Sequence, residues 1–98
     1  MESIIQKTAE ILKASGHPKR LEILVLLNKE KKLSVKQIHE TLGLSQPQTS
    51  RHLTVLKNAG ALICERSGGN SYYFLNDEYP FLKNIAAYLS GHSKNKIL

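Results

Sequence analysis

The stretch of sequence that decides the fold is residues 43–60, which read GLSQPQTSRHLTVLKNAG. Ser45 is a residue type that favours helix N-caps, and Pro47 is tolerated in the first turn of a helix. The apolar residues that follow recur at helical spacing up to Gly60, a residue type that commonly ends helices. The stretch therefore predicts a helix that Ser45 caps and that ends at about Ala59.

A shorter helix is predicted immediately before it. Ser34 is a candidate N-cap for residues 35–42, and Gly43 marks the end of that helix. Only residues 43–45 then separate the two helices. Two helices joined by a short turn that contains glycine are typical of a helix-turn-helix, which we place at residues 34–59.

A β-hairpin is predicted directly after these helices. Residues 61–66 and 71–75 are rich in β-prone side chains, and residues 67–70, Ser-Gly-Gly-Asn, join them. Glycine supplies the positive φ that tight hairpin turns need. A helix-turn-helix followed by a hairpin is the winged-helix arrangement, with the wing at residues 61–75.

Helices are also predicted on either side of this unit. The first ends at Gly16, and the last, residues 79–90, carries an apolar stripe too wide for one contact in so small a protein. Residues 18–27 are apolar on nearly every side, which predicts the centre of the core, and a charged connector, residues 28–32, follows. The predicted fold class is mainly α with a small β-hairpin. We expect a single winged helix-turn-helix domain over residues 1–98, with a homodimer through its first and last helices.

Composition narrows the class of partner. The chain has 98 residues, 14 Lys and Arg against 8 Asp and Glu, and a net charge of +6. This balance favours a polyanion, either nucleic acid or an anionic membrane surface. No apolar stretch approaches the ~18–20 residues of a membrane span, and the charge balance alone does not choose between the two partners. Because a helix-turn-helix is expected, we favour nucleic acid and expect no membrane partner. One cysteine cannot form a disulfide within the chain, which favours a cytoplasmic location.

Three segments resemble a known family. Residues 44–60 resemble the recognition helix of the ArsR/SmtB repressors, residues 16–21 (GHPKRL) are similar to that family's helix-opening signature, and residues 72–75 (YYFL) look like its wing exit strand. The resemblance covers about residues 9–76. It implies a prokaryotic, homodimeric transcriptional repressor that binds double-stranded DNA at an imperfect inverted-repeat operator.

The fourth helix supplies the DNA-reading candidates. At 100° per residue, Thr49, Leu53 and Leu56 face the core, and the polar side faces away. Recognition helices enter the major groove with their first turns, so the base-edge candidates are Gln46, Gln48, Ser50 and Arg51. The other DNA-binding candidates, expected mainly at phosphates, are His52, Thr54, Lys57, Arg66 and Asn70. His52 could equally contact a neighbouring side chain.

Two small residues carry separate expectations. Thr49 stands where the family usually has a branched aliphatic residue, and its buried hydroxyl is expected to bond a backbone carbonyl in the helix. Cys64 is expected to be a small buried hydrophobe.

The metal sites of the family are absent from the sequence. Its thiolate site needs Cys-x-Cys, where residues 34–36 read Ser-Val-Lys, and its last-helix site needs Asp-x-His, where residues 77–79 read Asp-Glu-Tyr. The four histidines lie on separate segments, although dimerisation could bring His39 or His92 near a partner's residues. We predict no metal and no cofactor.

Two other functions remain open at this point. No nucleophile–base pair, phosphate loop or carboxylate dyad indicates an enzyme. A winged helix can serve as a protein-interaction module, but such a face would more often offer apolar anchors than Arg51 and two glutamines. A small-molecule-responsive repressor could hold its ligand at the dimer interface, lined by Tyr79, Phe81 and Tyr88. We favour interface core for these aromatic residues.

Overall fold

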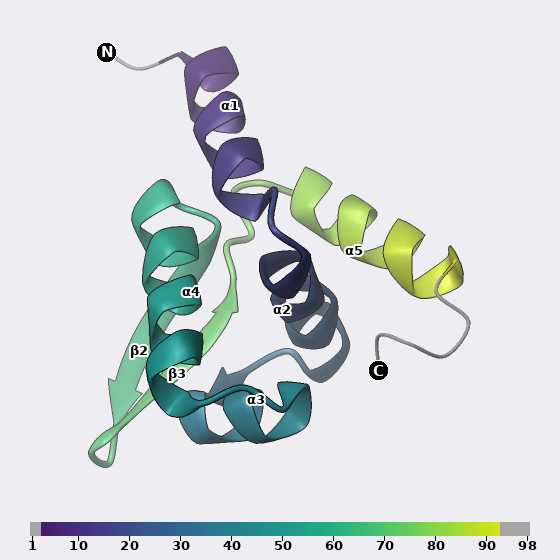
Figure 1. The fold of residues 1–98 in the computed structure, drawn as a ribbon. Coiled ribbons are helices and arrows are strands. Elements are labelled where there is room, and N and C mark those ends of the chain that lie inside the picture. The colour runs from purple at the N-terminus through teal and green to yellow at the C-terminus, as the bar shows by residue number, and fades with distance from the viewer. Residues whose placement is uncertain (1–2, 93–98) are drawn as a thin grey trace.

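The computed structural model describes residues 3–92 (Figure 1). Helices dominate it, and the strands form a small sheet, as the sequence predicts. The elements in chain order are α1 (Ile4–Ser15), α2 (Pro18–Glu30), β1 (Leu33–Ser34), α3 (Val35–Leu42), α4 (Gln46–Ala59), β2 (Leu62–Ser67), β3 (Asn70–Leu75) and α5 (Phe81–His92). No helix among residues 3–92 combines the length and the apolar character needed to cross a bilayer.

Three of the helices begin with the same reciprocal cap. In each, a serine Oγ accepts a hydrogen bond from the backbone N–H of the glutamine three residues on, and that glutamine's Oε1 accepts from the serine N–H. The caps predicted at Ser34 and Ser45 are confirmed, whereas the glutamine halves of the boxes were not predicted. The pairs are Ser3 with Gln6, Ser34 with Gln37, and Ser45 with Gln48.

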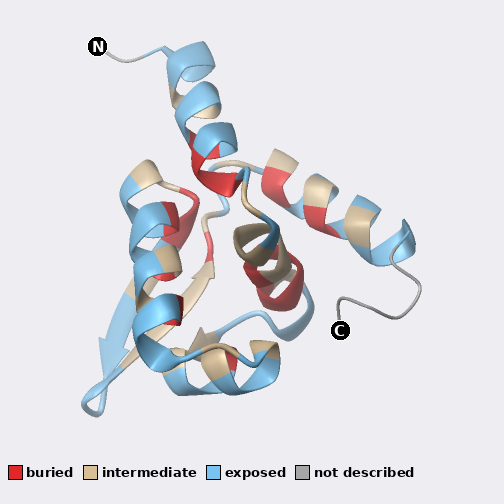
Figure 2. Ribbon diagram, viewed as in Figure 1, coloured by how far each residue is buried: buried red, intermediate tan, exposed pale blue. Residues whose placement is uncertain are grey.

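Helix α2 is the centre of the core, as its all-round apolar sequence predicts. Residues 23–27 are buried in succession, with at most 2% of any side chain exposed. Figure 2 shows this helix enclosed by the other elements, whose inward faces are the buried ones. The buried residues that the other elements contribute include Ile11, Ile38, Leu53, Leu56, Leu62 and Leu82.

The sheet is larger than the predicted hairpin. It has three strands in the order β1-β3-β2, because Leu33 and Ser34 pair with Tyr73 and Tyr72. Strand β1 is only two residues long and pairs with residues far along the chain, so no local periodicity of the sequence predicts it. Ser34 therefore has two roles, as the last residue of β1 and as the N-cap of α3. The first hairpin strand is shifted by one residue from its predicted position, to residues 62–67, and the second is one residue longer, at 70–75, which leaves residues 68–69 as the turn.

Two helix boundaries differ from the prediction. Helix α2 continues to Glu30, so most of the expected connector, residues 28–32, is helical. The last helix spans residues 81–92 rather than 79–90. Pro80 explains the later start, because a residue that precedes proline is disfavoured in the α region. Tyr79 and Pro80 instead offer their carbonyls to the N–H groups of Leu82 and Lys83.

Candidate nucleic-acid interface

Helix α4 lies across the molecule with one side buried and the other open (Figures 1 and 2). Gly43, with φ 69°, ends α3 in the left-handed conformation, and the Leu44 N–H closes this end on the His39 carbonyl at 3.1 Å. The predicted core stripe is confirmed, since Thr49, Leu53 and Leu56 are fully buried. The packing of these three side chains against the core therefore fixes which side of α4 faces solvent.

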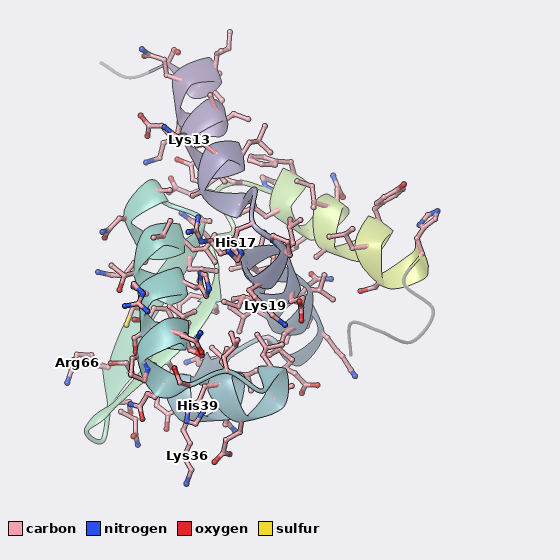
Figure 3. The ribbon with its side chains drawn as sticks, viewed as in Figure 1. Lys13, His17, Lys19, Lys36, His39 and Arg66 are labelled. Carbon is pink, nitrogen blue, oxygen red and sulfur yellow. The ribbon has the colours of Figure 1, made fainter. Side chains whose placement is uncertain are left out.

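Most of the predicted DNA-binding residues lie on this open side or on the wing. The exposed ones are Gln46, Gln48, Arg51, Thr54, Lys57, Arg66 and Asn70, whereas Ser50 and His52 are half-buried. Arg66 extends from β2 away from the body of the protein (Figure 3). Asn70 follows the turn at residues 68–69 and pairs with Ser67. The structure thus leaves the α4 candidates off the buried stripe, spread around the rest of the helix, and places the two wing candidates at the hairpin.

The charge of this region is one-sided. Between Glu40 and Glu65 the sequence contains no acidic residue, and the segment carries Arg51 and Lys57. Among the described residues neither cation has an acidic partner, nor does Arg66. Unpaired cations on an exposed helix and an adjacent hairpin suit a phosphate backbone, which rewards each neutralised charge by releasing counterions.

Gln48 has a structural task that the sequence interpretation missed. Its Oε1 accepts from the Ser45 N–H at 3.1 Å, and its own N–H donates to Ser45 Oγ at 3.2 Å. A bidentate contact with adenine needs both the oxygen and the nitrogen of a glutamine amide. While the cap is intact, Gln48 can donate from its Nε2, but the Ser45 N–H occupies one of the two lone pairs of its Oε1, so that only the second is left to accept from a base. The Ser-x-x-Gln spacing of residues 45–48 is the signal that would have revealed this role.

His52 is tied to two other helices. Arg20 of α2 donates from Nε to His52 Nδ1 at 3.2 Å and from a terminal nitrogen to the Ala14 carbonyl of α1 at 3.0 Å. The rings of His17 and His52 lie 4.7 Å apart, centroid to centroid. Burial, then the charges of His17, Arg20 and Arg51, lower the pKa of His52 below its usual 6.5. The neutral ring, with its proton on Nε2, is the form that this arrangement holds.

Two expectations about small residues are wrong. The Thr49 hydroxyl is buried, yet it has no hydrogen-bond partner among the described residues. Ser15 is the contrasting case, because its buried hydroxyl does donate to the Ile11 carbonyl, at 2.7 Å. Cys64, which stands on β2 opposite Tyr73, is half-buried rather than buried. Burial, and then a side-chain hydrogen bond with Cys64, raise the pKa of Tyr73.

The residues of the family's metal sites have other contacts. Ser34 caps α3, Asp77 pairs with Lys83 at 3.1 Å, and Tyr79 packs edge-on against Phe81 at 6.3 Å. Within residues 3–92 no group of three or more His, Cys, Asp or Glu side chains is close enough to hold a metal ion. Tyr88 stands apart from Tyr79 and Phe81 in its surroundings, because it is 63% exposed and stacks on His92.

Comparison with known proteins identifies the family. The family model for bacterial regulatory proteins of the arsR family matches residues 17–62, which include the helix-turn-helix. An HTH-type transcriptional regulator of Methanocaldococcus jannaschii, itself described as uncharacterised, is 40% identical over 73 residues, which cover 74% of this chain and 82% of the relative. The chain belongs to the arsR family.

Solved structures agree with this assignment. The transcriptional repressor PagR of Bacillus anthracis superposes on this arsR-family protein with a TM-score of 0.78 at 36% identity, over 87% of this chain and 94% of PagR. A homodimeric winged helix-turn-helix domain of Mycobacterium bovis superposes with a TM-score of 0.76 at 26% identity, over 92% and 81% of the two chains. This arsR-family protein is a DNA-binding transcriptional regulator with a winged helix-turn-helix fold.

Proposed function

We propose that this protein is a homodimeric repressor that binds an imperfect inverted repeat and blocks a promoter. The observation that carries the proposal is the acid-free, exposed face of α4, with Arg51 and Lys57 unpaired beside the wing cation Arg66. In the dimer, one α4 from each protomer enters a major groove, and the two grooves lie roughly one helical turn apart. PagR, a repressor at 36% identity, supports the direction of regulation.

The dimer is proposed from the apolar face of α1. Ile4, Ile5 and Leu12 are 67%, 78% and 47% exposed, and they line a hollow of about 370 Å³ together with Thr8 and Ala9. Figure 1 shows the first turns of α1 projecting beyond the other helices, so a single chain leaves this face uncovered. Exposed apolar patches of this kind mark association surfaces. The homodimeric relative from Mycobacterium bovis supports a second copy of the chain as the partner.

The residues divide by role. Gln46, Ser50 and Arg51 read base edges, and Gln48 contributes an amide donor beside them. His52, Thr54 and Lys57 hold the DNA backbone on the flank of α4, while Arg66 and Asn70 hold it at the wing. Phosphate contacts of this kind fix the register of a protein on DNA, and base contacts supply the specificity. A repressor that acts on promoter DNA works in the cytoplasm of a prokaryotic cell.

The test begins without a known operator. The protein is mixed with a pool of random DNA duplexes, and the duplexes that it binds are recovered and sequenced. The affinity of the protein for them is then measured at several salt concentrations. We expect an enriched inverted repeat with half-sites roughly 10–10.5 bp apart or a multiple of that, bound by two chains. Sequences without dyad symmetry, or a complex that contains one chain, would contradict the proposal.

A charge-adding variant tests the dimer separately. Ile5→Lys places an ammonium group in the apolar hollow of α1, where the folded monomer is already open to solvent. The added positive charge on its own would strengthen DNA binding. We therefore expect a species near the 11.0 kDa chain mass in sedimentation, and a loss of operator affinity of tenfold or more. A variant that stays dimeric with full affinity would exclude α1 from the interface.

A further inference from the structure

A cavity lies at the other end of α2 from the Arg20–His52 contact, between the last residues of that helix, β3 and the start of α5. Its volume is about 270 Å³, just under the ~300–1,000 Å³ typical of sites for drug-sized ligands. Leu27, Phe74 and Leu75 give it an apolar floor, and its polar rim consists of three lysines, Lys31, Lys32 and Lys83, together with Asn28 and Asp77. An apolar floor with cations at the rim suits a small molecule that has an apolar body and one negative end.

The three lysines differ in whether they already have an acidic partner. Lys83 is paired with Asp77 at 3.1 Å, and Lys32 is paired with Glu65, but all four side chains are about half exposed or more. Exposed ion pairs of this kind are weak and exchange partners readily. Lys31 has no acidic partner among the described residues, and its Nζ donates only to the Asn28 carbonyl, at 3.1 Å. Two of its three N–H donors are therefore available to a ligand.

The backbone at Lys31 gives a second, independent observation. Lys31 has φ 75° and ψ −59°, and it is the one non-glycine residue with positive φ in the described chain. The Lys32 N–H donates to the Glu30 carbonyl at 3.0 Å, which makes Lys31 the centre of a γ-turn of the rare, strained kind. Glycine would adopt this conformation without strain. A lysine kept in a strained conformation at the rim of a cavity indicates that its side chain has a use there.

We propose that this cavity binds a small organic carboxylate. The carboxylate accepts hydrogen bonds from the Nζ groups of Lys31 and Lys32, and the apolar body of the ligand lies on Leu27 and Leu75 against the ring of Phe74. Lys32 Nζ already stands 5.6 Å from the centroid of that ring, so charge and aromatic surface are presented together. A ligand that has only the carboxylate, or only the apolar body, would make only one of these two sets of contacts.

The site is placed to act on DNA binding, an inference that rests on the proposed function. Lys31 and Lys32 lead directly into β1, and β1 pairs with the wing strand β3 and ends at the N-cap of α3. A carboxylate that draws Lys32 from Glu65 also leaves an unpaired negative charge on wing strand β2. This negative charge opposes the DNA complex, so the ligand is expected to weaken operator binding.

Binding is tested first without DNA. Benzoate, benzyl alcohol and inorganic phosphate are titrated into the protein, followed by calorimetry and by the amide NMR signals of Lys31, Lys32 and Phe74. We expect benzoate to saturate these signals with an affinity at least tenfold above that of benzyl alcohol, which lacks the charge, and of phosphate, which lacks the ring. Phosphate binding as tightly as benzoate would overturn the proposal, because it would reduce the site to a cluster of surface lysines.

Two variants of equal charge make the test specific. Lys31→Gly removes the ammonium group and relieves the backbone, so we expect an unchanged or higher thermal midpoint together with a tenfold loss of benzoate affinity. Lys29→Ala removes one exposed ammonium from the same helix outside the cavity, and it should bind benzoate within twofold of the parent. Benzoate binding within twofold of the parent by Lys31→Gly would overturn the proposal even if the fold is stabilised.

The effect on DNA is measured last, with sodium chloride at matched ionic strength as the control. Saturating benzoate should weaken operator affinity at least threefold in the parent protein and leave Lys31→Gly unaffected. If benzoate saturates the cavity and operator affinity does not change, the coupling to DNA is wrong and the binding site itself stands. A protein that binds benzoate but no inverted repeat would contradict the proposed function instead.

Discussion

Arg20 and His52 are 32 positions apart in the chain, and the hydrogen bond from Arg20 Nε to His52 Nδ1 joins the first turn of α2 to the middle of α4. A guanidinium group can only donate hydrogen bonds. His52 Nδ1 must therefore carry no proton and act as the acceptor, which requires a neutral imidazole. The same arginine holds the end of α1 through the Ala14 carbonyl. Besides the packing of the buried stripe, α4 is therefore joined to α1 and α2 through one arginine, and this link requires an unprotonated His52 Nδ1.

The first prediction concerns acid. The folded-state pKa of His52 is lowered below 6.5, so the unfolded chain takes up the proton first as pH falls. The stability that the neutral ring contributes is present above about pH 6.5, the unfolded-state pKa, and is lost as pH falls from there through the lower folded-state pKa. Urea unfolding at several pH values should show this decline, and His52→Asn, which keeps an acceptor but does not titrate, should reduce it. His39→Gln, on α3, is the control; an equal reduction there would remove His52 as the cause.

The second prediction is a gain in stability from Thr49→Val. The substitution replaces a buried, unbonded hydroxyl by a methyl group of nearly the same volume, so we expect about 1 kcal/mol of stabilisation. Thr41→Val is the same chemical change at an exposed threonine whose hydroxyl donates to the Gln37 carbonyl, and it should fall within about 0.5 kcal/mol of the parent. Urea unfolding compares the two. A destabilised Thr49→Val would imply an internal water bound to the hydroxyl.

The third prediction separates the two roles of Gln48. Glutamate can replace glutamine in a capping box and suits a helix N-terminus, so Gln48→Glu should keep the stability of the parent. A carboxylate at the DNA-facing end of α4 should nevertheless weaken operator binding at least tenfold. Gln6→Glu makes the same change in the matching box of α1 and should preserve operator affinity to within threefold. Similar losses in both variants would point to net charge rather than position.

The fourth prediction distinguishes base contacts from phosphate contacts. Arg51→Ala should cost roughly 1–3 kcal/mol on the selected operator and relax the choice of base at one position. Lys57→Ala should weaken binding to all sequences alike and reduce the salt dependence. Binding to operator and random DNA, measured at several salt concentrations, decides between these patterns. Equal losses on both DNAs for Arg51→Ala would assign Arg51 to the phosphates.

The fifth prediction is that zinc, cadmium and arsenite leave the operator complex intact. A regulatory site for such ions needs about three or four Cys, His or carboxylate ligands at fixed spacing, and the sequence offers one thiol and scattered histidines. Metal-stripped protein on labelled operator is titrated with each species. A chelator-reversible loss of tenfold in affinity would make His39 and His92 of the dimer the first ligands to replace.

Local sequence signals predicted the helix-turn-helix because its boundaries are set locally. Ser34, Gly43, Ser45 and Gly60 act through their own backbone and the next turn, so each could be recognised from the sequence. Strand β1 could not, because its two residues gain their structure only by pairing with Tyr72 and Tyr73. The apolar spacing of residues 79–90 places the start of α5 too early, because that spacing does not reflect the restriction that Pro80 imposes on the residue before it.

The candidate site was predictable in outline and not in its contacts. Helical periodicity placed Arg51 outward and Leu53 inward, since both follow from the same rotation per residue. The Arg20–His52 bond and the unpaired Thr49 hydroxyl depend on where three helices meet, and no spacing within one helix encodes that. Whether these residues read bases or phosphates depends on DNA that the chain alone does not contain.

The double role of Ser34 has a mechanical consequence. A residue that ends a sheet strand and caps a helix couples the tilt of the hairpin to that of α3, and Asn76 ties the far end of the hairpin to α4 through the Gly60 carbonyl at 2.9 Å. These contacts couple α3, α4 and the hairpin to one another, so under the proposed function α4 and the wing would approach DNA as one unit. The duplex must supply the bending, so flexible pyrimidine–purine steps should be favoured between the two contact regions, at base pairs that no side chain touches.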